Sequence, residues 1–140
     1  MGSLAMEKAV AQRDLFGCGI ACVAYITGNS YRSAKRKYFK NGGKADKVGY
    51  WCKDLVWALS LAQKEYSYKY IKARMRFSEG TVVFIKRSKH HPAGHYLVRT
   101  RNGWMDPWIN FDAKSPDAKR ARAGFCSKLP GKPIYAIFPI

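Results

Sequence analysis

The spacing of the apolar residues changes near residue 65, and this change constrains the fold more than any other feature of the chain. Before it, apolar side chains recur every three or four residues, as they do in a helix. From Tyr66 onward, short β-rich runs alternate apolar and polar residues. Helices followed by a block of strands indicate an α+β fold, with N-terminal helices packed on one side of a small antiparallel sheet or half-barrel.

Start and stop signals delimit the expected elements. Gly28 ends a first helix that begins at Cys18, and Ser30 is placed to cap a second helix. Asn102-Gly103 is typical of a tight β-hairpin, because both residues tolerate positive φ. The sequence predicts helices over about 18–27, 31–40 and 50–64, a short basic helix within 114–123, and strands over 66–71, 81–86, 96–100, 104–105 and 134–138.

Length and composition fit one domain. The chain has 140 residues, of which 47% are hydrophobic, and this suffices for one core, which we expect over residues 6–140. Residues 1–5 are expected to be an appended remnant or a disordered end. The sequence contains no evident signal peptide and no run of about 20 apolar residues. We therefore expect no membrane span, and a protein that is cytoplasmic or is delivered as an effector or toxin domain.

The four cysteines are irregularly spaced, in a chain large enough to fold without disulfides. We expect reduced thiols. A tetrahedral zinc site is an alternative, because Cys18 and Cys22 are four residues apart and so are His91 and His95. A proline and a glycine interrupt the histidine pair, and the two pairs are far apart in the sequence. We therefore expect no metal and no other cofactor.

The formal net charge is +17, from 26 basic and 9 acidic residues. Such a charge attracts nucleic acid, anionic lipid or acidic protein without distinguishing among them. Two basic clusters stand out, one in the expected second helix and one in the loop before residue 95: Arg32, Lys35, Arg36, Lys37 and Lys40, and Lys86, Arg87 and Lys89. The partners that we infer are a peptide or protein substrate of acidic character and, alternatively, nucleic acid.

Cys18 opens the first expected helix, with a glycine on either side and Gln12 six residues upstream. The thiolate is the reactive form of cysteine, and a helix N-terminus beside an imidazolium favours it. The glycines leave space for a substrate carbonyl. The amide of Gln12 and the backbone N–H of Cys18 are placed to stabilise an oxyanion. Cys18 is therefore the candidate nucleophile; an inert buried thiol is the alternative, and Cys22 is expected in the core.

His95 begins an apolar strand, which places its imidazole at a sheet end within reach of a helix terminus, so it is the candidate base. Asp106 is the candidate orienting acid. A strict two-residue turn between these strands would pair His95 with Asn110 and leave Asp106 too far along the ladder. Asn110 is therefore the reserve orienting residue. His90 and His91, in the basic loop, are expected to be exposed or to contact phosphate.

The candidate residues lie in three short segments. Residues 18–24, Cys-Gly-Ile-Ala-Cys-Val-Ala, follow Gln12, and Gly94-His95-Tyr96-Leu97-Val98 and Asp106-Pro107 come later. In this order, over nearly the whole chain, they resemble the bacteriocin-processing peptidase domains of bacterial ABC transporters and their stand-alone relatives, within the papain-like cysteine peptidase superfamily. The resemblance implies a papain-like fold and peptide cleavage through a thioester. It makes Cys18 the nucleophile, His95 the general base and acid, Asp106 the orienting residue and Gln12 the oxyanion donor.

Two features depart from those peptidases. Gly17 stands where they usually have Asp, and the spacing between His95 and Asp106 is shorter than their usual hairpin. The spacing is more similar to that of other compact papain-like hydrolases, including bacterial effector and toxin domains. Those domains carry a His, an Asn-Gly turn and an Asp followed closely by Trp. The substrate therefore does not follow from the resemblance alone.

The sequence supports three hypotheses. The first is a cysteine peptidase or amidohydrolase that cleaves a peptide or isopeptide bond with a Cys-His-Asp triad and an oxyanion hole formed by Gln12 and the backbone. The second is a catalytically silent papain-like module that binds nucleic acid or an acidic protein through its basic surface. The third is acyl transfer by the same residues to an acceptor other than water.

Overall fold

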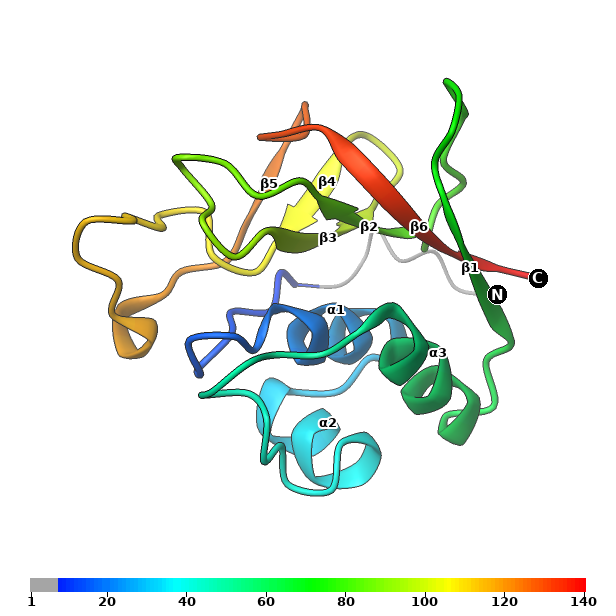
Figure 1. Cartoon of the computed structure of the whole chain (residues 1–140). Coiled ribbons are helices and arrows are strands. Elements are labelled where there is room, and N and C mark those ends of the chain that lie inside the picture. The colour runs from blue at the N-terminus through cyan, green and yellow to red at the C-terminus, as the bar shows by residue number, and fades with distance from the viewer. Residues whose placement is uncertain (1–7) are drawn as a thin grey trace.

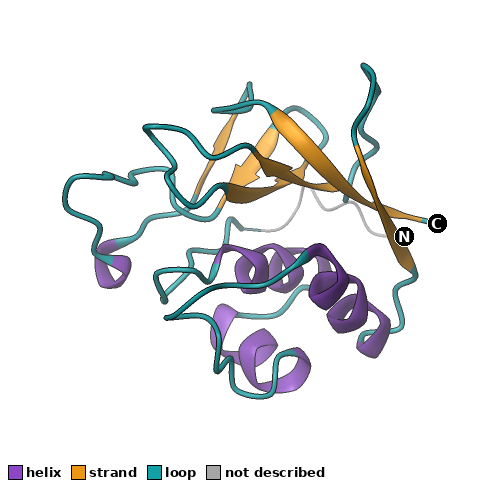
Figure 2. Cartoon of the chain, viewed as in Figure 1, coloured by secondary structure: helices purple, strands orange, loops and turns teal. Residues whose placement is uncertain are grey.

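Three helices come first along the chain and pack on one face of a β-sheet (Figures 1 and 2). The computed structural model describes residues 8–140, and the expectation for residues 1–5 lies outside them. The helices are α1 (Cys18–Thr27), α2 (Tyr31–Tyr38) and α3 (Cys52–Leu61). The predicted α+β class, with N-terminal helices on an antiparallel sheet, is confirmed.

The sheet has six strands in the order β1-β6-β2-β3-β4-β5, and the pairs are antiparallel. β3 and β4 form a hairpin, and β6, the last strand, lies between β1 and β2. The strand bounds are β1 (Tyr66–Tyr70), β2 (Val82–Ile85), β3 (His95–Arg99), β4 (Trp104–Asp106), β5 (Gly124–Cys126) and β6 (Pro133–Pro139). β5 was not predicted, and the helix expected within 114–123 is only a 3-10 turn, Ala118–Arg120.

Most of the core lies between the helices and the sheet. α1 is buried from Gly19 to Ile26 because α2, α3 and β3 all contact it. Burying one side chain such as Ile20 contributes about 1.5–3 kcal/mol, so α1 is firmly held. A smaller apolar cluster covers the other face of the sheet and comprises Val83, Ile85, Leu97 and Trp104. The first residue of α1 is thus fixed on a rigid platform.

The predicted helix ends are largely correct. Gly28 ends α1 in the left-handed conformation, with φ of 72°. The Ser30 hydroxyl caps α2 by accepting from the Ser33 N–H at 3.1 Å. The Asp54 carboxylate accepts from the Trp51 N–H at 2.8 Å at the start of α3. Among the described residues, every helix is too short or too polar to cross a bilayer.

Candidate active site

Cys18 is the first residue of α1, and its side chain is half-buried. The first backbone N–H groups of a helix have no acceptor within the helix, and the positive end of the helix dipole lies there. The preceding residue, Gly17, has no side chain that covers this end. A negative charge on the sulfur of Cys18, or on a substrate oxygen beside it, is therefore favoured by the helix.

The two glycines around Cys18 are required by packing. A Cβ on Gly17 would collide with the Tyr31 hydroxyl of α2. A Cβ on Gly19 would lie 2.9 Å from Leu55 Cδ1 and 3.5 Å from Tyr96 Cδ2. The sequence suggested that these glycines make room for a substrate. The structure adds a different reason, because they let the start of α1 pack closely against its neighbours.

His95 and Asp106 are joined by a hydrogen bond across the hairpin of β3 and β4. Arg99 pairs with Trp104, so residues 95, 97 and 99 share a face with residues 104 and 106. Continuing this register places Asp106 opposite Leu97, diagonally from His95, which is within reach of long side chains. His95 Nε2 lies 2.7 Å from Asp106 Oδ1, and both side chains are buried. The Trp108 N–H donates to the same Oδ1 at 2.9 Å and fixes the carboxylate.

The register of this hairpin differs from the expected one. The Thr100 N–H donates to the Gly103 carbonyl at 2.8 Å, so Arg101 and Asn102 form the two-residue loop. Gly103 therefore belongs to the strand side of the turn, where a Cβ would collide with the Cys126 carbonyl of β5. The shift brings the candidate acid two residues closer to His95 than a turn at Asn102-Gly103 would. The register is thus set by the close contact between Gly103 and β5, a strand that the sequence did not predict.

The Cys18 side chain also acts on the His95 ring, because its hydrogen bonding and its charge both raise the pKa of His95. Since Nε2 faces Asp106, Nδ1 is the nitrogen left for the sulfur. Burial disfavours a charged ring, but the hydrogen bonds and negative charges of Asp106 and Cys18 outweigh it and raise the pKa of His95 from 6.5 to about 10. Burial would raise the pKa of Asp106, yet the His95 hydrogen bond and charge lower it overall. These shifts favour a protonated His95 ring beside an ionised Asp106 carboxylate.

Gln12 is almost fully buried beside the start of α1. Its Nε2 donates to the carbonyls of Asp14 and Leu15, at 3.0 and 3.1 Å. Its Oε1 is buried without a hydrogen-bond partner within residues 8–140. The amide thus holds the segment that leads into Cys18, and it must release one carbonyl before it can donate to a substrate oxygen.

Asn110, the reserve orienting residue, is exposed and bound elsewhere. Its amide donates to the Arg120 carbonyl at 3.2 Å and accepts from the Arg122 N–H at 2.8 Å. Asp106, and not Asn110, contacts His95.

Comparison with known proteins supports the fold. No protein-family model matches this chain, and no curated protein matches it. A solved structure does, namely the peptidase domain of Streptococcus ComA, a bi-functional ABC transporter involved in a quorum-sensing pathway. The two chains are 22% identical, the match covers 94% of this chain and 96% of that one, and the TM-score is 0.52. The fold is papain-like. The resemblance indicated by the sequence is thus confirmed at the level of the fold.

His91 is one site neighbour that sequence reasoning missed. It was expected to be exposed or to contact phosphate, but it is buried, and its ring stacks on that of His95, with centroids 4.9 Å apart and planes 10° apart. Phe111 stacks on its other side, at 5.3 Å and 16°. Burial first, and then the charge of His95, lower the pKa of His91 to about 4. The sequence signal was the spacing of four residues to His95, which we considered only as part of an alternative zinc site and did not favour.

The structure does not bring together the residues of the alternative zinc site. Among residues 8–140, no three His, Cys, Asp or Glu side chains converge as a metal site. All four cysteines are unpaired, and Cys22 is fully buried in the core as predicted. Burial, and then the charge of Cys18, raise the pKa of Cys22.

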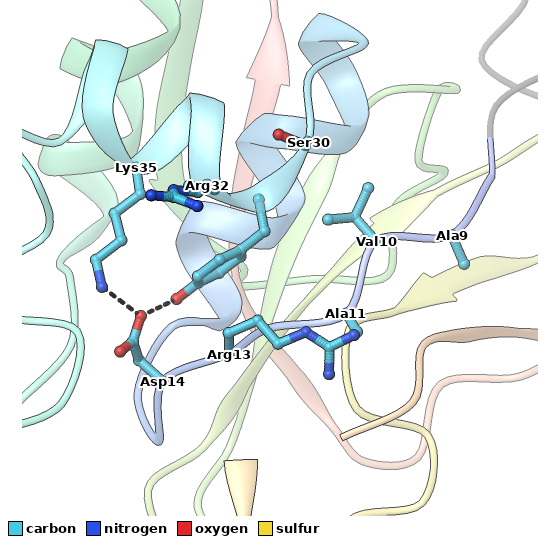
Figure 3. Close-up of a pocket in the computed structure, with 9 residues that line it drawn as sticks. Ala9, Val10, Ala11, Arg13, Asp14, Ser30, Arg32 and Lys35 are labelled. Atoms are coloured by element: carbon cyan, nitrogen blue, oxygen red, sulfur yellow. Dashed lines mark hydrogen bonds and ion pairs between the residues drawn. The ribbon is translucent and has the colours of Figure 1, made fainter. Parts of the chain in front are cut away.

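A basic hollow lies beside the start of α1 (Figure 3). It has a volume of about 530 Å³ and lies between residues 9–14 and α2, with Arg13, Arg32 and Lys35 on its walls. A second hollow of about 310 Å³ shares Arg32 and Lys35 and adds Arg36. The Asp14 carboxylate in this groove accepts from Lys35 at 2.8 Å and from the Tyr31 hydroxyl at 2.6 Å. We call the two hollows together the basic groove.

Proposed function

We propose that this protein is a papain-like cysteine hydrolase that cleaves a peptide or isopeptide bond. Cys18 is the nucleophile, His95 the general base and acid, and Asp106 the residue that orients His95. The observation that carries the proposal is the buried His95 ring, which is hydrogen-bonded to Asp106 at 2.7 Å and whose pKa is raised by both Asp106 and Cys18. These three residues come from three different elements: Cys18 and His95 are the first residues of α1 and β3, and Asp106 is the last residue of β4.

The proposed reaction begins with a thiolate–imidazolium pair. The Cys18 sulfur attacks the carbonyl carbon of the scissile amide, and the π electrons move to the carbonyl oxygen. The C–N bond then breaks, His95 gives its proton to the leaving nitrogen, and an acyl thioester remains on Cys18. Water attacks the thioester while His95 accepts a proton. The carboxylic acid leaves and the thiolate is restored.

The oxyanion that forms in both steps needs hydrogen-bond donors. The backbone N–H of Cys18 is one, because it lies in the first turn of α1. Gln12 is the second candidate, and in this proposal its amide turns away from the Asp14 or Leu15 carbonyl when substrate binds. Its burial in the segment that leads into α1 supports this role. If Gln12 only holds the loop, Gln12→Ala will lower the melting temperature and kcat/KM together.

The test is digestion of a diverse peptide library, with products identified by mass spectrometry. We expect cleavage by the wild type and a loss of at least about 10³-fold in Cys18→Ala. Cys52→Ala is the matched control, because Cys52 is also half-buried and also opens a helix. Digestion in ¹⁸O-water separates hydrolysis, which labels the new carboxyl group, from acyl transfer. Cleavage that persists in Cys18→Ala would refute the proposal.

The basic groove favours a second candidate function, the binding of an acidic polypeptide. Arg32 and Arg36 are one turn apart on α2 and are exposed, and α2 has no acidic residue that compensates them. Like charges at this spacing destabilise a helix by about 0.2–0.5 kcal/mol, which a bound anion relieves. Asp14 shows that a carboxylate fits against Lys35. The one aromatic ring of the groove, Tyr31, is buried, which disfavours stacking of nucleic-acid bases there.

Fluorescence anisotropy with labelled poly-L-glutamate and a single-stranded oligonucleotide tests this second function. We expect poly-L-glutamate to bind more tightly, with an affinity that falls as salt rises. Arg32→Ala/Arg36→Ala should weaken binding about 10-fold, while the charge-matched control Lys64→Ala/Lys72→Ala should not. Equal losses in both double variants would show that only net charge matters. If the oligonucleotide binds more tightly than poly-L-glutamate, the ligand of the basic groove is nucleic acid and not an acidic polypeptide.

A further inference from the structure

The His95 ring needs more than its hydrogen bond to Asp106 to face Cys18. A single contact at Nε2 fixes one atom of the imidazole but leaves the ring free to tilt about that contact. A flat group against the ring face removes this freedom. His91 provides such a group, because its ring lies nearly parallel to the His95 ring, with a centroid distance of 4.9 Å.

The backbone holds His91 firmly over His95. The His91 N–H donates to the Ser88 hydroxyl at 3.1 Å, and the His91 carbonyl accepts from the N–H groups of Ser88 and Gly94, at 3.0 and 2.9 Å. Gly94 has φ of 76°, and a Cβ there would collide with the Phe84 ring. The turn therefore ends with a glycine directly before His95. The shape of this turn fixes the position of the His91 ring relative to the His95 ring.

The face of the His91 ring that points away from His95 is covered by the chain segment that follows Asp106. Phe111 stacks on His91, and Trp108 packs edge-on against Phe111 with centroids 4.8 Å apart. The same segment fixes Asp106 through the Trp108 N–H. One short stretch of chain, residues 106–111, thus holds both the hydrogen-bond partner of His95 and the support of the stack.

The surroundings keep His91 uncharged when His95 is protonated. His91 faces His95, Asp106 and the neighbouring His90, and it is buried. A second positive charge against the imidazolium would be repelled, whereas a neutral aromatic face attracts a cation. His91 is thus suited to stabilise His95 in its charged form without competing with it for the proton.

We propose that His91 is a positioning residue for the Cys18–His95 pair, whose neutral ring stacks on His95 and holds its plane toward the sulfur. The inference rests on the proposed function, since it assumes that Cys18 and His95 act together in catalysis. It predicts that a flat aromatic ring is what position 91 requires, and that the ring nitrogens of His91 are dispensable. Phenylalanine is therefore expected to replace His91, while alanine is not.

The experiment measures two properties that need no substrate. The first is the rate at which iodoacetamide alkylates Cys18, followed by peptide mapping so that the other thiols are distinguished. The second is the NMR titration of the His95 ring. Four proteins are compared: wild type, His91→Phe, His91→Ala and His90→Ala. His90 is the matched control, because it is adjacent, of the same type and exposed.

We expect His91→Ala to slow alkylation of Cys18 at pH 7 by about 10-fold and to lower the pKa of His95. His91→Phe should stay within about 3-fold of wild type, and His90→Ala should be unchanged. If His91→Ala is too unstable, His91→Leu, which fills the space without a flat face, takes its place and should behave in the same way.

Two results would overturn the inference. One is a folded His91→Ala, or His91→Leu, with the alkylation rate and His95 titration of the wild type. The other is a His91→Phe that is as impaired as His91→Ala, since the imidazole nitrogens would then matter more than the stack. Failure of the proposed function is measured by a different experiment, the peptide digestion, in which cleavage would persist in Cys18→Ala.

Discussion

Cys18 opens α1 and Cys52 opens α3, and both side chains are half-buried. Each sulfur therefore lies at the positive end of a helix dipole. Their partners on β3 are consecutive residues. Cys18 raises the pKa of the His95 ring, while Cys52 lies 3.9 Å from the Tyr96 hydroxyl, which donates to the Tyr50 carbonyl at 2.8 Å.

The difference teaches that a helix end alone does not make a nucleophile. Burial raises the pKa of Cys52, and the hydrogen bonds from Tyr96 and from its own backbone only partly oppose it. Cys18, by contrast, shares a buried imidazole with a carboxylate. Two consecutive residues of β3 thus differ in what they offer a thiol: His95 carries an ionisable ring and Tyr96 a phenol.

Replacing His95 should have the largest effect. His95→Gln keeps a group that donates to Asp106 but cannot take a proton from Cys18. We expect turnover of a cleaved peptide to fall about 10³-fold, together with alkylation of Cys18, while alkylation of Cys52 does not change. Steady-state kinetics and peptide mapping measure the two. Parallel loss of reactivity at both thiols would mean that His95 acts on the fold and not on Cys18.

The stability of the protein should fall with rising pH because of His95. Its folded pKa of about 10 exceeds the ordinary 6.5, so the native state holds the proton more tightly. The stabilisation is complete below pH 6.5 and is lost as pH approaches 10, by on the order of 2–4 kcal/mol in the free energy of unfolding. Asp106, whose pKa is lowered, loses its contribution only in acid.

Denaturant unfolding of wild type and His95→Gln at pH 6.5, 8 and 9.5 measures this dependence. The difference in free energy of unfolding between the two should shrink as the pH rises. A difference that is constant with pH would show that His95 is not protonated in the native state.

Asp106→Asn should have a smaller effect, because an amide oxygen still accepts from His95 but carries no charge. We expect kcat/KM to fall about 10–100-fold and the pKa of His95 to fall with it. Asn110→Ala is the matched control and should match the wild type in both. An unchanged His95 titration in Asp106→Asn would show that the carboxylate charge does not hold the imidazolium.

Tyr96→Phe should have the smallest effect and tests whether the two thiols are independent. Losing the hydrogen bond to the Tyr50 carbonyl should cost about 1 kcal/mol of stability, measured by denaturant unfolding. Alkylation of Cys18 should stay at the wild-type rate. A large fall there would show that the adjacent residues of β3 act as one unit.

Much of the fold could be predicted from the sequence, because its signals are local. α1 is apolar all round and ends at a glycine, and Ser30 caps α2, so both helices were predicted near their observed bounds. β5 was missed because Gly124–Cys126 is too short to show alternation. The helix expected within 114–123 is only the 3-10 turn Ala118–Arg120, and none of the residues of that turn is buried against the core.

The parts of the site that could not be predicted depend on contacts between distant segments. The hairpin register is set where Gly103 meets the Cys126 carbonyl, a contact across two strands. His91 looked like another residue of a basic loop, and its burial depends on Phe111, twenty residues later. Gln12 was predicted to be an oxyanion donor, but its amide donates to the Asp14 and Leu15 carbonyls, and these contacts depend on a loop conformation that the sequence does not reveal.

The most direct test of the central claim, that the imidazole distinguishes Cys18 from Cys52, is the ratio of their alkylation rates. Wild-type protein is treated with limiting iodoacetamide at pH 7, and each site is quantified by peptide mapping. The account predicts that Cys18 reacts at least about 10-fold faster than Cys52 and that this preference disappears in His95→Gln. Equal rates in the wild type, or a preference that survives in His95→Gln, would contradict it.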